Sequence, residues 1–260
     1  MAEKGVPGLV PPGRSRCRPP RRPGRSCCCV TVKDPPDRPD PAIYSQDEQL
    51  AAGQVPTWDS PDIVTNFFVP WKLKTETEVT VRNLSSTASA VNTQVSLYTA
   101  PHGLGMQAVP LSAKVVSLAP GAQATLYFPL SQALLGGDQR IGTRVQIQHP
   151  HDQVLINSHG GQQIAGMTTK ESGRNPTLHF PVQNASSSPR PITLTVLANS
   201  LGGVVTPGVH AFAPWEQIQA SLKLHIPASL HDTVERVTVV AWAPDGSAID
   251  GLTYVVTVND

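Results

Sequence analysis

Apolar and polar residues alternate with a period of two through most of the chain after Trp58. Val79 and Val81 alternate with polar neighbours, and Val145 and Ile147 repeat the pattern. This period is that of a β-strand with one buried face and one wet face. The same alternation marks Val95 and Leu97, Ala124 to Phe128, Phe180 and Val182, Ile192 to Val196, Leu222 to Ile226, Val237 to Ala241, and Leu252 to Val258. Short strands of this kind, separated by Ser, Asn, Pro and Gly, predict antiparallel β-sandwiches with little helix.

The order of these segments is repeated along the chain. The landmarks of residues 79–157 recur in the same order in residues 178–250, and matching landmarks are separated by 92 to 101 residues. Both copies contain a strand that ends in Asn, at Asn83 and Asn184, and a later Ala-Pro pair. Repetition at nearly constant spacing indicates one structural unit used twice. We therefore predict two tandem immunoglobulin-like sandwiches, over residues 58–168 and 169–260, with residues 159–165 as the closing strand of the first.

Residues 30–57 are predicted to form an extended, proline-rich arm with one short helix. Prolines at four of the eight positions 34–41 stiffen its first part. Ser45 and Glu48 have the spacing of a helix capping box, and Gly53 provides a stop. So short a helix is not stable alone in water. Tyr44 and Leu50 are therefore expected to dock on a domain surface or on another subunit.

Residues 1–29 form a basic head whose composition differs from the rest of the chain. Lys4 and six arginines stand against Glu3 alone, so the head carries +6 and the remaining residues carry −5 of the total +1. We interpret the head as disordered, because it has too few apolar residues to offset the entropy of ordering, or as residues translated from an over-called gene start. It has no apolar region typical of a secretion signal. A nucleic-acid or membrane-surface contact is the alternative interpretation of its arginines.

All four cysteines, Cys17 and Cys27 to Cys29, lie in the head. Disulfides therefore cannot hold the predicted sandwiches together. Three consecutive thiols are also poorly spaced for a tetrahedral zinc site. No run of about 20 apolar residues predicts a membrane span.

Four segments of the first copy resemble the bacterial adhesion-type immunoglobulin-like domains known as CARDB. They are the opening at residues 60–65, the strand ending in Asn83, the strand from Val91 to Leu97, and the turn at residues 116–121. The second copy matches in part, since Pro214-Trp215 replaces the Pro-Gly turn of the first. The resemblance implies the fold of a bacterial immunoglobulin-like domain, and it specifies no particular activity, because the matching motifs mark turns and strand ends.

The only chemically suggestive cluster is His149, His151 and Asp152, with His159 downstream. Two imidazoles and a carboxylate are a ligand set for zinc or copper. The second copy, however, has the turn sequence Ala-Pro-Asp-Gly at the corresponding residues 243–246. A decorated turn is therefore the first interpretation, and a metal-binding protein is an alternative.

No catalytic motif is present: the sequence lacks a Gly-x-Ser-x-Gly elbow, a His-Glu-x-x-His pair and a phosphate-binding glycine loop. We therefore predict a non-enzymatic protein without a cofactor. Large aromatic residues are instead candidates for contact with a partner, because Tyr and Trp often anchor interfaces. These candidates are Phe67, Phe68, Trp71 and Trp215.

The expected function is that of a structural or interaction protein in a multi-subunit assembly, such as a phage-tail-like particle, with protein partners or self-assembly. Its expected location is the cytoplasm or the particle itself. The alternative is a cell-surface or secreted adhesion module that binds protein or glycan.

Overall fold

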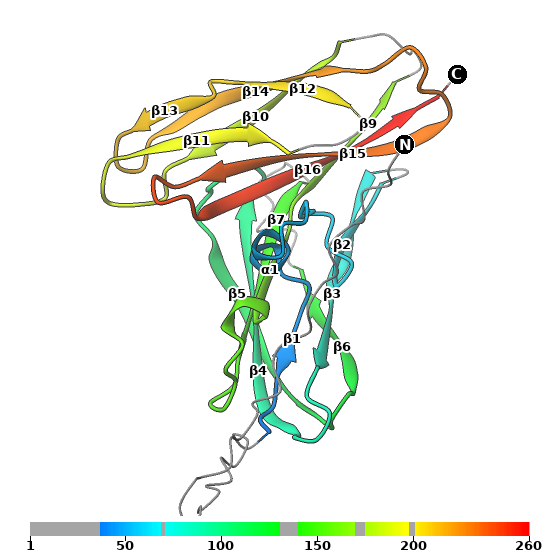
Figure 1. The fold of residues 1–260 in the computed structure, drawn as a ribbon, viewed down its shortest axis with the longest axis vertical. Coiled ribbons are helices and arrows are strands. Elements are labelled where there is room, and N and C mark those ends of the chain that lie inside the picture. Colours follow the sequence, from blue (N-terminus) through cyan, green and yellow to red (C-terminus); the bar gives the residue numbers. More distant parts are fainter. Residues whose placement is uncertain (1–36, 69–70, 131–139, 170–174, 198–200, 260) are drawn as a thin grey trace, which may run out of the picture. The chain divides into compact units, whose positions relative to one another are not determined.

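The structure is a computed structural model that describes residues 37–68, 71–130, 140–169, 175–197 and 201–259. Asp37 to Asp260 form one compact unit. Strands dominate these residues, as the alternation predicted (Figure 1). The basic head and its cysteines lie outside the described residues. No helix in the described part is long and apolar enough to cross a membrane.

The first sandwich is built from β1 to β8, in two antiparallel sheets (Figure 1). One sheet has the order β1-β3-β2, with β6 also paired to β3: β1 is Pro41–Ala42, β2 is Ile63–Phe68, β3 is Trp71–Asn83 and β6 is Gln123–Pro129. The other has the order β5-β4-β7-β8: Val109–Leu118, Ala90–Pro101, Ile141–Gln148 and His159–Gln162. Its core contains the predicted inward residues Val79, Val81, Val95, Leu97, Phe128, Val145 and Ile147.

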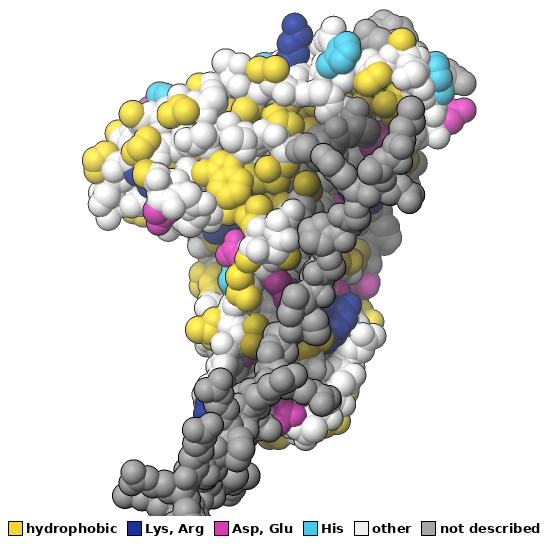
Figure 2. All heavy atoms as spheres, viewed as in Figure 1, with side chains coloured by type: hydrophobic (Ala, Val, Ile, Leu, Met, Phe, Trp, Pro, Cys, Tyr) yellow, Lys and Arg dark blue, Asp and Glu magenta, His cyan; other side chains and the backbone are white. Residues whose placement is uncertain are grey.

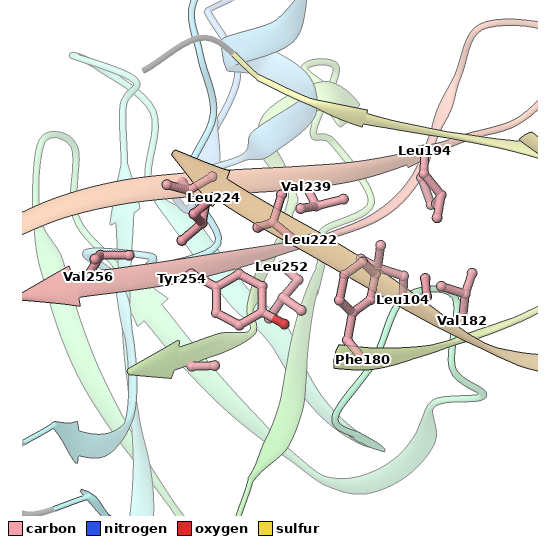
Figure 3. Close-up of a cluster of buried hydrophobic side chains, with 14 of the residues drawn as sticks. Leu104, Phe180, Val182, Leu194, Leu222, Leu224, Val239, Leu252, Tyr254 and Val256 are labelled. Atoms are coloured by element: carbon pink, nitrogen blue, oxygen red, sulfur yellow. The ribbon is translucent and has the colours of Figure 1, made fainter. Parts of the chain in front are cut away.

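The second sandwich is built from β9 to β16. Its smaller sheet has the order β10-β14-β12, with bounds Thr177–Gln183, Gln217–His225 and Gly202–Thr206. Its larger sheet has the order β13-β11-β15-β16-β9: Val209–Phe212, Arg190–Val196, Thr233–Trp242, Ala248–Val258 and Ile164–Thr169. Inward residues of both sheets meet in one core, where Phe180 lies beside Tyr254 (Figure 3).

The two sandwiches use the same ladders in the same order. β3 pairs with β6, β4 with β7, and β7 with β8. The corresponding strands of the second sandwich repeat these pairs as β10 with β14, β11 with β15, and β15 with β16. The landmarks recognised in the sequence therefore occupy equivalent places in the two sandwiches.

The expected single closing strand at residues 159–165 was wrong, because the segment is shared between the sandwiches. Its first part, β8, pairs with β7, whereas β9 begins at Ile164 and pairs in parallel with β16. Gln163 stands at the change of sheet, and its backbone bonds both ways: its N–H donates to the Trp58 carbonyl at 2.9 Å, and its carbonyl accepts from Thr253 at 3.0 Å. Because the bond to Thr253 aligns the chain with β16, the segment after Gln163 continues as β9 in the second sandwich.

Trp58 is a wedge between the sandwiches. Trp58 is 5% exposed, and its backbone N–H donates to the Thr253 hydroxyl at 2.8 Å. Gly161 and Gly251 leave the room that the indole fills, since a Cβ on Gly251 would lie 2.4 Å from the ring. Leu104 makes a second connection, because this residue of the first sandwich is wholly buried in the core of the second.

The arm contains the predicted short helix. Helix α1 spans Gln46–Ala51, and the Ser45 hydroxyl accepts from the Glu48 N–H as the capping box requires. The same hydroxyl donates to the Ile156 carbonyl at 2.6 Å, within the 3-10 turn η2, Leu155–Asn157. Gln46 also pairs with the backbone of Gly161 through both its amide nitrogen and its amide oxygen. The described part of the arm is therefore bound to its own chain.

Candidate interaction surface

Two buried asparagines hold equivalent turns in the two sandwiches. Each side-chain amide donates to carbonyls of the neighbouring loops, Asn83 to Ala88 and Ala119 at 2.8 and 3.2 Å, and Asn184 to Ser188 and Ala213 at 2.9 and 3.0 Å. The strand-end asparagines seen in the sequence are themselves buried, and their amides thus supply donors to backbone carbonyls of the loops around them. They fix the shape of the turn that follows β5 in one sandwich and β13 in the other.

Both turns require one residue in the left-handed backbone region. In the first turn this residue is Gly121, with φ +68°, and its N–H donates to Ser85 at 2.9 Å. In the second it is Trp215, with φ +61°, and its N–H donates to Ser186 at 3.2 Å. Glycine adopts this conformation without steric cost, whereas other L-residues pay about 1–2 kcal/mol. The second turn therefore carries a strained tryptophan where the first has the residue best suited to the geometry.

The backbone strain at Trp215 is not offset by deep burial of its side chain. It is 50% exposed, and its neighbours Pro214 and Gln217 are exposed as well. Glu216 beside it is occupied by the turn, since its carboxylate accepts from the Ala213 N–H at 2.6 Å and contacts His210 at 3.2 Å. A left-handed conformation held by a non-glycine residue, where glycine would avoid the strain, is found often at functional positions. Trp215 is therefore the strongest candidate for contact with a partner.

Tyr44 and Leu50, by contrast, are placed within the chain's own structure. The Tyr44 hydroxyl accepts from the Thr57 N–H at 3.0 Å, and its backbone N–H donates to Asp62 at 2.7 Å. Burial raises the pKa of Tyr44, against a smaller lowering by the bond from Thr57. Leu50 is half-buried on α1. Of the two docking sites expected for the arm, a surface of its own chain is the one observed.

Phe67, Phe68 and Trp71 are brought together by the β2–β3 hairpin. Phe68 is the register partner of Trp71, and Phe67 precedes it on the same strand. The side chains of these three residues lie outside the part of the chain that the structure describes.

The histidine cluster is divided by the fold. His149 Nδ1 accepts from the backbone N–H of His151 at 3.2 Å, and its Nε2 lies 3.1 Å from the Val91 carbonyl. One ring nitrogen is thus engaged within the turn and the other with the backbone of β4. Asp152 accepts from the Val154 N–H at 2.9 Å, as a turn carboxylate does, and burial raises its pKa above the ordinary value.

His159 lies elsewhere, on β8, with its Nε2 2.9 Å from the Asp47 carboxylate of α1. The hydrogen bond that the His159 ring donates to the Asp47 carboxylate raises the pKa of His159, against a smaller opposing effect of burial. Among the residues described, no three His, Cys, Asp or Glu side chains are grouped to hold a metal ion. The proposed cluster of His149, His151 and His159 is therefore not formed, because the strands direct these residues to different neighbours.

No family model matches the chain, and no curated protein matches it. Among solved structures, it is similar to the N-terminal domain of PorA at 14% identity, over 36% of this chain and 86% of that one, with a TM-score of 0.29. Red sea bream transglutaminase is 12% identical over 83% of this chain and 33% of its own length, with a TM-score of 0.28. The CupB6 tip adhesin from Pseudomonas aeruginosa is 8% identical over 70% and 90%, with a TM-score of 0.25. None of these likenesses assigns an activity, a ligand or a partner to this chain.

Proposed function

We propose that this chain is a non-enzymatic interaction protein whose Trp215 turn contacts a protein partner in a multi-subunit assembly. The observation that carries the proposal is a half-exposed indole in a left-handed position where the equivalent turn has glycine. Folding alone favours glycine at such a position. A tryptophan there gains its advantage from a contact outside the chain, and tryptophan is the residue most often found at interface hot spots.

The second sandwich as a whole carries exposed apolar surface. Val204 and Val209 are more than half exposed. Figure 2 shows apolar side chains reaching the surface over the second sandwich, with few charged ones among them. An aromatic residue on a domain with weakly charged apolar surface suits a protein interface. The Trp58 wedge supports the role further, because coupled sandwiches present such a surface at a fixed angle to the rest of the chain.

We also infer that the sandwiches arose by duplication of one adhesion-type immunoglobulin-like domain. The shared ladders and the repeated Asn turns support this origin. The boundary between the domains then falls at Gln163, between β8 and β9.

The function is tested by Trp215→Gly, with Tyr127→Ala as the matched control, because Tyr127 is an aromatic residue 47% exposed on the first sandwich. Each variant replaces the native chain in the producing cells, and native size separation with mass spectrometry gives the mass of its complex. We expect wild type and Tyr127→Ala to be recovered in the same complex, and Trp215→Gly as the free chain. Recovery of Trp215→Gly in the complex at the wild-type level would refute the role of this turn.

An adhesion module that binds glycan is the second candidate, in a cell-surface or secreted setting. The observation in its favour is the half-exposed indole beside the uncharged residues Pro214 and Gln217, since sugars stack on such rings. A glycan array decides between the candidates: binding that Trp215→Gly abolishes favours the adhesion module, and an array without binding leaves the protein partner as the proposal.

A further inference from the structure

A cleft of about 650 Å³ lies between the two sandwiches, within the single compact unit. Its floor is the outward face of β4, β7 and β8, and its other wall is formed by residues 105–108, residues 248–250, Ala185 and Arg190. Volumes of this size hold small ligands, and such sites occur preferentially at junctions between domains.

The floor presents a grid of polar side chains. Across the strands, Tyr98 is the register partner of Arg144, and Gln146 is the partner of His159. Register partners in a sheet point to the same face, so these four side chains share the floor. Arg144 is also the partner of Gly161, which has no side chain to cover it. The floor therefore combines one aromatic ring with several hydrogen-bonding groups.

Asp250 fixes the position of Arg144 from the opposite wall. It is 8% exposed and accepts from Arg144 Nη2 at 2.8 Å, the Gly105 N–H at 3.0 Å and the Gly251 N–H at 2.9 Å. This carboxylate is thus committed to three donors of its own chain. Arg144 keeps further N–H groups, since a guanidinium has five.

Arg190 brings a second guanidinium to the cleft. Its Nε donates to the Asn184 amide oxygen at 2.8 Å, so the same asparagine that holds the Trp215 turn also orients this arginine. No carboxylate of the described residues is paired with Arg190. The other carboxylate of the lining, Asp47, is bound to His159 at 2.9 Å. The cleft therefore contains oriented cationic donors, while both of its carboxylates are already occupied.

We propose that this cleft binds a small carboxylate-bearing ligand, of monosaccharide or dipeptide size, through the free N–H groups of Arg190 and Arg144. A planar guanidinium matches a carboxylate in shape and charge and can bind it through two parallel bonds. Tyr98 supplies a ring against which the rest of the ligand packs. The carboxylate belongs either to a sugar acid or to the C-terminus of a peptide.

Calorimetric titration with four probes tests the inference: D-glucuronate and its neutral counterpart D-glucose, and acetyl-Ala-Ala with a free carboxylate and the same dipeptide as its amide. We expect saturable binding of at least one acid at millimolar concentration, and clearly weaker binding of its neutral counterpart. Which acid binds identifies the source of the carboxylate. Loss of a hydrogen bond to a charged group weakens binding about 10- to 100-fold, and this is the effect expected of Arg190→Gln.

Lys223→Gln is the matched control, because it removes a positive charge from an exposed residue of β14 outside the cleft. It should leave the binding constant unchanged, as should Trp215→Gly, so this result is separable from the test of the partner surface. If Arg190→Gln does not fold, Arg190→Lys serves instead. It keeps the positive charge, loses the planar guanidinium that forms two parallel bonds, and should still weaken binding. Absence of binding by both acids, equal binding of the neutral probes, or wild-type affinity in the folded Arg190 variants would each overturn the inference.

Discussion

Substitution of Gly251 by alanine tests whether the Trp58 wedge determines how the two sandwiches are joined. An added Cβ would lie 2.4 Å from two carbons of the indole ring, well inside the separation at which carbon atoms attract. The ring has little room to move away, because Gly161 lies close to it on another side. A Cβ placed on Gly161 would be 3.5 Å from the ring, which is ordinary van der Waals contact. Its backbone is held as well, by Thr253 on one side and Gln163 on the other.

Overpacking of this kind costs about 1–3 kcal/mol. We therefore expect Gly251→Ala to lower the free energy of unfolding by that amount, measured by urea denaturation followed by far-ultraviolet circular dichroism. Gly208→Ala is the control, because a Cβ there meets nothing within 4 Å. Its effect should be within about 0.5 kcal/mol.

A double-mutant cycle separates the clash from other causes. Trp58→Ala alone should cost about 3–5 kcal/mol, as does the loss of other large buried aromatics. Once the indole is gone, Gly251→Ala should cost almost nothing further, because the cost arises from contact between the two side chains. Additive costs in the double variant, or a Gly251→Ala protein as stable as Gly208→Ala, would refute the wedge.

Three further substitutions test other contacts. Asn184→Ala removes the donor to two turn carbonyls and should destabilise the chain by about 0.5–1.5 kcal/mol per hydrogen bond lost, in the same denaturation assay. Unchanged stability would show that this asparagine does not hold the turn. Ser45→Ala removes the cap of α1 and should cost about 0.5–2 kcal/mol, and protease resistance of the arm should fall with it. Asp47→Asn tests the pair with His159, whose pKa is raised in the folded chain: the pair stabilises fully below the unfolded pKa of about 6.5, and this contribution is lost as the pH rises through the folded pKa. The variant should therefore be less stable than wild type at acidic pH and equal to it at alkaline pH, and a pH-independent difference would contradict the ion pair.

The strands and their inward faces could be predicted from the sequence because the period of the side chains is a local property. Phe180 and Val182 are buried and His179 between them is exposed, as the alternation requires. The helix at residues 46–51 was also predictable, since its cap involves Ser45 and Glu48 alone. The candidate Trp215 was visible as a departure from the Pro-Gly turn, but its left-handed backbone and its exposure were not.

Contacts between distant segments were beyond the reach of the sequence. The cleft is such a case, because Tyr98, Arg144 and His159 are neighbours only after three strands have paired. No sequence motif marks the cleft, since many of its residues lie on strands that show the ordinary alternation of apolar and polar residues. The wedge at Trp58 was missed for the same reason: its partner glycine is far along the chain.

The sequence by itself determined an all-β chain of antiparallel sheets, because alternation and turn residues are encoded over short stretches. The tertiary structure decided where the first sandwich ends, because Gln163 forms bonds to both sandwiches and the strand after it pairs with β16. It also decided which polar residues have partners. His159 pairs with Asp47 and not with His149, and Arg190 in the cleft donates to Asn184. Such pairings depend on the register of strands and the docking of the arm, and these are fixed by packing over the whole compact unit.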